Sequence, residues 1–147
     1  MSELSKSNAE YLRQWFRTCP FIPATKKTGI DYLSDTPTEY SVYASPSTLR
    51  YRENIWGEEI LEDNQEENFI FAAREVYGPE ASQNGQNLLF FEQVCMWIID
   101  QNNLRNFPEW NQGTVKSIVP TLTAYPIAIG SNAAKYQIQL KVTYRRK

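Results

Sequence analysis

The residues best suited to chemistry are six acids that fall within ten positions of one predicted loop: Glu58, Glu59, Glu62, Asp63, Glu66 and Glu67. Paired carboxylates can hydrolyse glycosidic bonds, and carboxylate oxygens can hold Mg²⁺. Catalytic acids need apolar surroundings that tune their pKa values, whereas a run of acids on a loop is typical of a solvated, repulsive tip. The cluster therefore favours an exposed contact surface, with a carboxylate-dependent enzyme as the remote alternative.

Other catalytic groups are scarce. The sequence contains no histidine, which is the commonest general base and the commonest transition-metal ligand. Cys19 and Cys95 lie far apart in apolar company, where a reduced thiol behaves as a small hydrophobe, and two thiols cannot complete a four-ligand zinc site. No glycine-rich loop leads into a helix. We therefore expect no catalytic residue, no metal and no cofactor.

Basic residues occur in two small groups. Arg50 and Arg52 alternate with apolar neighbours, which places them on one face of a predicted strand. Arg145 and Arg146 lie at the end of the sequence, beside a third cation, Lys147. A nucleic-acid interface would combine such cations with exposed aromatic rings. A solvated strand face and a terminal tail explain them more simply.

Two of the four tryptophans are candidates for interface anchors. Trp56 and Trp110 stand beside polar loops, outside the strongest apolar patterns, and large aromatic side chains dominate many interfaces. Trp15 and Trp97 fit the core instead. The candidate assembly interface is Arg50, Arg52, Trp56, Glu58, Glu59, Glu62, Asp63, Trp110, Arg145 and Arg146.

Length and composition indicate one folded domain, residues 1–147. Hydrophobic residues make up 41% and charged residues 22% of the 147 residues, which is close to the average for globular proteins. The formal net charge of -2 offers no field that would attract nucleic acid or anionic lipid. We expect no membrane span, no signal peptide and no sequence-specific nucleic-acid binding, and we expect folding in the cytoplasm.

The first half of the sequence predicts one helix and several strands. Apolar residues at helical spacing over residues 4–19 predict an amphipathic helix that Pro20 ends. Residues 26–29 have the composition of an exposed turn. Strand-like stretches follow at residues 30–33 and 38–44.

A long antiparallel hairpin is predicted next. Its arms are residues 49–61 and 68–76, and its charged tip is residues 62–67. The continuous apolar run at residues 69–73 predicts a central strand covered on both faces.

The second half predicts a long apolar helix at about residues 82–103, with only a narrow polar stripe. Residues 114–125 predict a strand that is bulged at Pro120, and residues 126–134 predict a turn. Strict alternation over residues 136–144 predicts a strand with one buried face. The fold class is therefore α+β: an antiparallel or mixed sheet with a long hairpin, packed by an N-terminal helix and a central apolar helix.

The order of these segments resembles a family of small phage proteins from Gram-positive hosts, described as tail terminator or minor capsid proteins. The resemblance is carried by YLRQWFRTCP, TGIDYLSDTPTEYSV, NFIFAAREVYG, LLFFEQVCMWI and KYQIQLKVTYRRK, which together span nearly the whole chain. Every matching residue is of a kind that packs. Residues 56–68 of the predicted hairpin and the loop at residues 105–113 match nothing in the family.

The resemblance implies a fold like the lambda-type tail terminator and a ring, usually of six subunits. Such a ring caps the tail tube, stops its polymerisation and provides the joint to the neck or head. The implied partners are further copies of the chain, the tail tube protein, a neck or head connector protein and, as a further candidate, the tail sheath protein. The implied location is the neck-proximal end of the virion tail. A head–tail connector and a collar component of a headless, tail-like bacteriocin are the alternatives.

Overall fold

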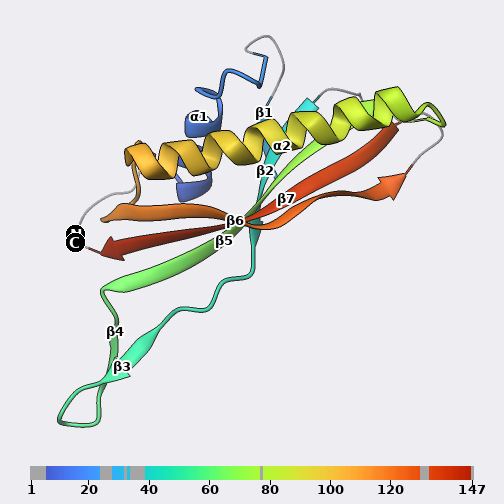
Figure 1. Ribbon diagram of the computed structural model, residues 1–147. Helices are drawn as coiled ribbons and strands as arrows, with labels where there is room; N and C mark the ends of the chain where they lie inside the picture. Colours follow the sequence, from blue (N-terminus) through green and yellow to red (C-terminus); the bar gives the residue numbers. More distant parts are fainter. Residues whose placement is uncertain are drawn as a thin grey trace.

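The described residues form a mixed sheet, two helices and a separate hairpin (Figure 1). The structure is a computed structural model that describes residues 6–23, 28–31, 33, 39–76, 78–129 and 133–146. The elements are, in order, α1 (Asn8–Phe16), β1 (Thr28–Ile30), β2 (Glu39–Ser45), β3 (Tyr51–Glu53), β4 (Glu59–Leu61), β5 (Asn64–Val76), α2 (Ala81–Leu104), β6 (Gly113–Ile129) and β7 (Ala133–Arg146).

The five-stranded sheet has the order β1-β2-β5-β7-β6. Strands β1 and β2 run parallel, and the other neighbouring pairs are antiparallel. The predicted α+β class with a mixed sheet is therefore confirmed. β5 lies at the centre, as its apolar run predicted, and pairs with β2 on one side and β7 on the other.

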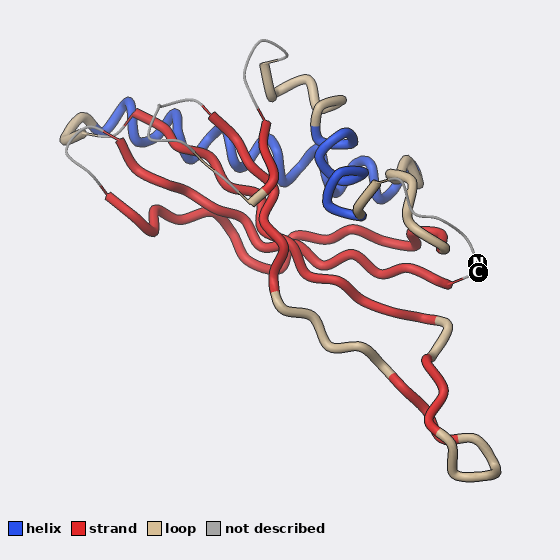
Figure 2. Tube along the Cα trace, turned by 180° about the vertical axis from the view of Figure 1, so that it is seen from behind, coloured by secondary structure: helices blue, strands red, loops and turns tan. Residues whose placement is uncertain are grey.

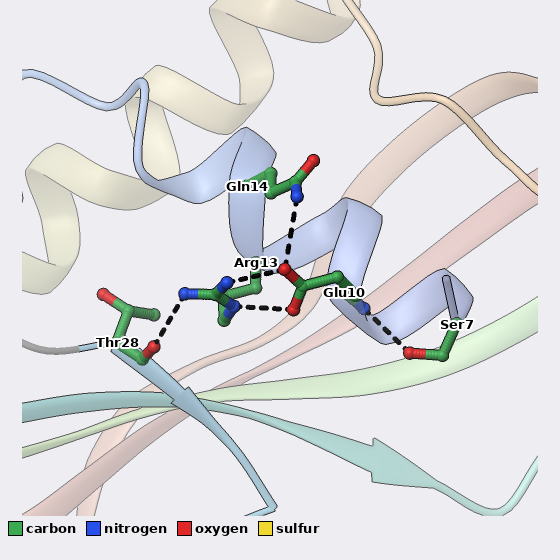
Figure 3. A network of polar contacts seen from close by, with 5 residues as sticks. All are labelled: Ser7, Glu10, Arg13, Gln14 and Thr28. Atoms are coloured by element: carbon green, nitrogen blue, oxygen red, sulfur yellow. Dashed lines mark hydrogen bonds and ion pairs between the residues drawn. The ribbon is translucent and has the colours of Figure 1, made fainter. Parts of the chain in front are cut away.

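Helix α1 begins at a side-chain cap and is tied to the sheet by one arginine (Figure 3). The Ser7 hydroxyl accepts a hydrogen bond from the Glu10 amide at 3.1 Å, which satisfies a free N–H group of the first turn. Arg13 donates two hydrogen bonds to the Glu10 carboxylate, at 2.6 and 2.8 Å. Its Nη1 also donates to the Thr28 carbonyl at 3.3 Å. Arg13 thus joins α1 to β1.

Both helices pack on the same face of the sheet, and they meet at Phe71 of β5. The Phe16 ring of α1 stacks on Phe71 with centroids 4.6 Å apart, and Phe91 of α2 contacts Phe71 edge-on at 6.3 Å. The two helices also touch each other, because the Trp15 and Trp97 ring centroids are 4.6 Å apart. Figures 1 and 2 show the helices together on one side of the strands. The core is therefore a single layer between the helices and the sheet, and aromatic rings join the helices to the central strand.

The opposite face of the sheet, called the second face below, carries mostly polar side chains. Along β7, fully buried residues alternate with half-buried ones from Ala133 to Tyr144, which confirms the predicted alternation. The half-buried positions include Lys135, Gln137, Gln139 and Lys141. No described helix packs on this face, although Ala72, which lies on it opposite Gln137, is fully buried. The prediction that β5 is covered on both faces therefore holds at Ala72, but no second layer of helix covers the strand within the described residues.

The hairpin is shorter than predicted, and its tip lies earlier in the sequence. β3 pairs with β4, and residues 54–58 form the turn. Residues 64–76 form one continuous strand of the sheet, so Glu66 and Glu67 belong to β5 and not to a tip. The acidic composition suggested the wrong turn, because pairing with β7 holds both residues in an extended conformation.

Two other predicted turns are strands. Thr28 and Gly29 were predicted in an exposed turn, but they form β1 beside β2, and Thr28 is buried. Residues 126–129 continue β6 where a turn was predicted. Strand β6 remains paired because irregularities absorb the mismatch with β7, and one of them adjoins Pro120 as predicted.

Helix α2 matches its predicted length but is only partly buried. Its sheet-facing side includes Phe91, Val94, Trp97 and Ile98. Five further apolar side chains on this helix are exposed, namely Leu88, Leu89, Met96, Ile99 and Leu104. The apolar surface therefore extends beyond what the core of one chain buries.

Matched leucine truncations test where the core lies. Leu12 of α1 is fully buried, whereas Leu104 at the end of α2 is 73% exposed. We expect Leu12→Ala to lower the free energy of unfolding by about 2–5 kcal/mol and Leu104→Ala to change it by less than about 0.5 kcal/mol. Urea denaturation of both variants measures this difference, and equal losses would contradict the described packing of α1.

Candidate functional site

The largest exposed feature is a hairpin that leaves the sheet, called the projecting hairpin below and comprising residues 46–63. Figures 1 and 2 both show it pointing away from the sheet and from the helices. Ile55 and Trp56 at its turn are 90% and 77% exposed. Six of the predicted interface residues besides Trp56 lie on it, namely Arg50, Arg52, Glu58, Glu59, Glu62 and Asp63.

Asn54 organises the turn of the projecting hairpin. Its side-chain oxygen accepts hydrogen bonds from the Trp56 and Glu58 amides at 2.9 and 3.0 Å. Its main chain also bonds Gly57 and Glu58. Gly57 has a φ of 78°, a left-handed conformation that favours glycine. The turn thus has a defined shape, and it holds the indole of Trp56 in solvent.

Gln65 of β5 anchors the base of the projecting hairpin. Its amide group is 1% exposed, accepts from the Arg50 amide at 3.0 Å and donates to the Arg50 carbonyl at 2.9 Å. It also donates to the Glu62 carbonyl at 2.8 Å. The side chain therefore continues the hydrogen-bonding pattern of the hairpin into the sheet and sets the direction in which the hairpin leaves.

The end of β7 supports the same base. The Arg146 amide donates to the Asp63 carbonyl at 2.7 Å, and its guanidinium donates to the Leu61 carbonyl at 3.3 Å. Arg145 is the cross-strand neighbour of Asn64. The structure therefore brings the predicted cations of the C-terminal segment next to the predicted hairpin residues.

The six acids do not converge on a common point. Glu58, Glu59 and Asp63 are exposed on the projecting hairpin. Glu66 forms an ion pair with Arg50 at 2.9 Å, and Glu67 accepts a hydrogen bond from the Asn8 side chain. Among the described residues, no three acidic or thiol side chains are grouped closely enough to hold a metal ion.

Trp110 is not an exposed anchor, and the prediction for this residue is wrong. It is 6% exposed and packs edge-on against Phe69, with ring centroids 5.8 Å apart. The Tyr144 ring lies 5.9 Å away. These partners are distant in sequence, so the polar loop beside Trp110 gave no sign of its burial.

A groove with a volume of about 570 Å³ lies between α2 and β6. Its lining is mainly apolar and includes Leu88, Met96 and Ala124, together with Glu92 and Cys95. Burial and the charge of Glu92 raise the pKa of the Cys95 thiol, which is the opposite of what a nucleophilic cysteine requires. The groove is suited to contact with an apolar group.

Glu75 is the most perturbed acid among the described residues. It lies on the helix side of β5, is 8% exposed, and burial raises its pKa to about 7. Burial, and then the charge of Glu75, raises the pKa of Tyr40 to about 12. Perturbed carboxyls occur in active sites, but Glu75 does not line the groove between α2 and β6. Because burial disfavours the charged carboxylate, we expect Glu75 to make the free energy of unfolding depend on pH.

Three features of this surface were not predicted. Gln65 was not expected to be buried, Ile55 was not expected at the exposed turn, and Glu53 was not expected to face Glu59 across the hairpin. The position of the turn decides all three, so an Asn-x-x-Gly signal at residues 54–57 was the available clue.

The sequence matches no protein-family model, and no curated protein is significantly similar to it. Within the described residues, no helix combines the length and apolar character that a membrane span requires.

Replacing Gln65 tests the anchor. Gln65→Leu removes the hydrogen bonds that Gln65 makes to the Arg50 amide and the Glu62 carbonyl, whereas the Arg50 carbonyl keeps its bond from the Glu62 amide. We therefore expect stability to fall by about 1–3 kcal/mol. Amide hydrogen exchange across residues 49–62 should accelerate more than exchange in β7. Gln139→Leu makes the same change on the half-buried second face and should leave hairpin exchange unaltered. Equal effects of the two substitutions would rule out this role for Gln65.

Glu75 predicts a pH-dependent stability. Its pKa rises from an ordinary value of 4.5 to about 7 in the folded chain, so the folded state favours the protonated form. Compared with Glu75→Gln, the unmodified chain should keep its full free energy of unfolding below pH 4.5. It should lose about 1–3 kcal/mol of that free energy as the pH rises through 7. Denaturation curves at several pH values measure this, and parallel pH profiles for the two proteins would exclude it.

Proposed function

We propose that the chain is a structural protein of a bacteriophage tail, a terminator that assembles into a ring on the end of the tail tube. The resemblance in segment order implies a ring, usually of six subunits in that family, with the tube protein and a neck or head connector protein as partners. The ring would stop tube polymerisation and provide the joint to the neck or head. This function requires matching surfaces and no catalysis.

The projecting hairpin is the observation that carries the proposal. An isolated two-stranded hairpin is marginally stable in water, yet this one exposes Ile55 and Trp56 at its turn. Leu49 and Tyr51 on its first arm are also exposed, at 56% and 52%. Exposed apolar side chains gathered on one projecting segment are typical of a contact with another protein.

The outer side of α2 supports the same interpretation. Leu88 and Met96 border the groove between α2 and β6, and Leu89 is exposed on the same helix. A ring subunit needs separate surfaces for its two neighbours and for the tube end, because a head-to-tail contact uses two different patches of each copy. The hairpin and the outer side of α2 are two such patches.

Assembly and tail length test the proposal together. Native mass spectrometry and negative-stain microscopy should find closed rings that cap purified tail tubes. Deleting the gene should give overlong tails, whereas loss of a head–tail connector would give tails of normal length that are unattached to heads. A strict monomer that caps no tubes would refute the proposal.

Trp56 supplies a residue-level test. Trp56→Ala should leave the unfolding transition almost unchanged, because the side chain is 77% exposed. We expect it to weaken ring formation or tube capping by about tenfold or more if Trp56 is an anchor. Trp56→Phe keeps an aromatic ring and should recover part of the loss. If Trp56→Ala caps tail tubes as well as the unmodified chain does, Trp56 is not an anchor of the interface.

A further inference from the structure

Like charges lie directly opposite each other at two separate places on neighbouring strands. One of these pairs is negative, and the other is positive. Glu53 of β3 lies directly opposite Glu59 of β4 on the projecting hairpin. Arg74 of β5 lies directly opposite Lys135 of β7 on the second face. Like charges in this arrangement destabilise a pair of strands. Each pair therefore concentrates charge of one sign on its own surface, and the two surfaces are complementary in sign.

The surroundings of Arg74 and Lys135 are cationic and aromatic. The Lys135 ammonium lies 4.5 Å from the centroid of the Tyr43 ring, and burial together with the charge of Arg74 lowers the pKa of Lys135. Glu39 of β2 is the cross-strand neighbour of Arg74 on its other side. On the second face, cross-strand register places four cations, Arg74, Lys135, Lys141 and Arg145, against two acids, Glu39 and Glu66. A third acid, Asp31, lies close enough to Tyr43 for its charge to raise the pKa of that tyrosine.

The two pairs cannot meet within one chain. The hairpin leaves the sheet at Asn64, and Arg74 lies ten residues further along β5, which corresponds to about 33 Å of strand. The hairpin also points away from the strands (Figures 1 and 2). A contact between Glu53 or Glu59 and the cationic pair must therefore join two molecules.

We propose that the projecting hairpin of one copy lies on the second face of the next, so that Glu53 and Glu59 meet Arg74 and Lys135. The contact joins two different patches, which is the kind of contact that forms a ring when the rotation between neighbours closes. Charge complementarity between the acidic arm and the basic face selects a second copy as the occupant. The inference rests on the proposed self-assembly and specifies the surfaces that form it.

Charge exchange tests the contact on the full chain. Glu59→Lys and Lys135→Glu should each weaken self-association by about tenfold or more, as measured by native mass spectrometry or sedimentation over a range of concentrations. The double variant Glu59→Lys/Lys135→Glu should recover most of the association, because each exchanged residue again faces an opposite charge. Glu109→Lys makes the same charge change at an exposed site on another loop and should associate like the unmodified chain.

Stability separates this contact from a folding defect. Glu59→Lys places a cation opposite Glu53, so this variant should unfold at the same temperature as the unmodified chain or higher. Lys135→Glu places an acid opposite Arg74 but loses the contact of the ammonium with the Tyr43 ring, so its unfolding temperature should change little. Loss of assembly without loss of stability is the expected result. Rising salt concentration should also weaken association of the unmodified chain.

The outcomes distinguish the two proposals. Normal rings from both single variants, or a double variant that associates no better than the singles, would overturn the hairpin contact and leave the proposed function standing. An unmodified chain that remains monomeric at every concentration would overturn both. Loss of tube capping with rings intact would instead assign these charges to the tube contact and would also overturn the inference.

Discussion

The contact of both helices with Phe71 is the constraint on which the rest of the structure depends. Phe16 stacks on this ring from α1, and Phe91 contacts it from α2. Because one side chain of the central strand receives both helices, they must share one face of the sheet. The second face can then carry charges and amides, and the hairpin lies outside the core. The aromatic residues that bury the helices thus determine which surfaces remain available for contact.

Long periodic segments could be predicted from the sequence, whereas the hairpin could not be placed correctly. The alternation of β7 and the apolar length of α2 persist over many residues, so local errors do not change the interpretation. The hairpin depended on its turn, and the acidic stretch was a weaker guide than Asn54 and Gly57, whose backbone and side-chain contacts form the turn. The half-exposed side of α2 also escaped prediction, because apolar composition does not indicate which residues one chain can cover.

The exposure of a candidate interface residue could be predicted only where it depends on the neighbouring residues in the sequence. Trp56 stands in a polar stretch and is exposed, but the same reasoning failed for Trp110, which Phe69 and Tyr144 cover from distant positions. The pairing of Arg74 with Lys135 was not predicted either. Strand register joins residues that are sixty-one positions apart in this case, and no local pattern specifies that register.

The base of the hairpin explains how a marginal element can serve as a contact arm. Gln65 and Arg146 hold its main chain at the point where it leaves the sheet, and Asn54 shapes the turn at the other end. Between them, Glu53 and Glu59 repel each other and favour a partner of opposite charge. A segment with a fixed direction and shape loses less conformational freedom on binding than a flexible loop would. In the proposed assembly, the buried amide of Gln65 would contribute without touching a partner, because it determines where the hairpin points.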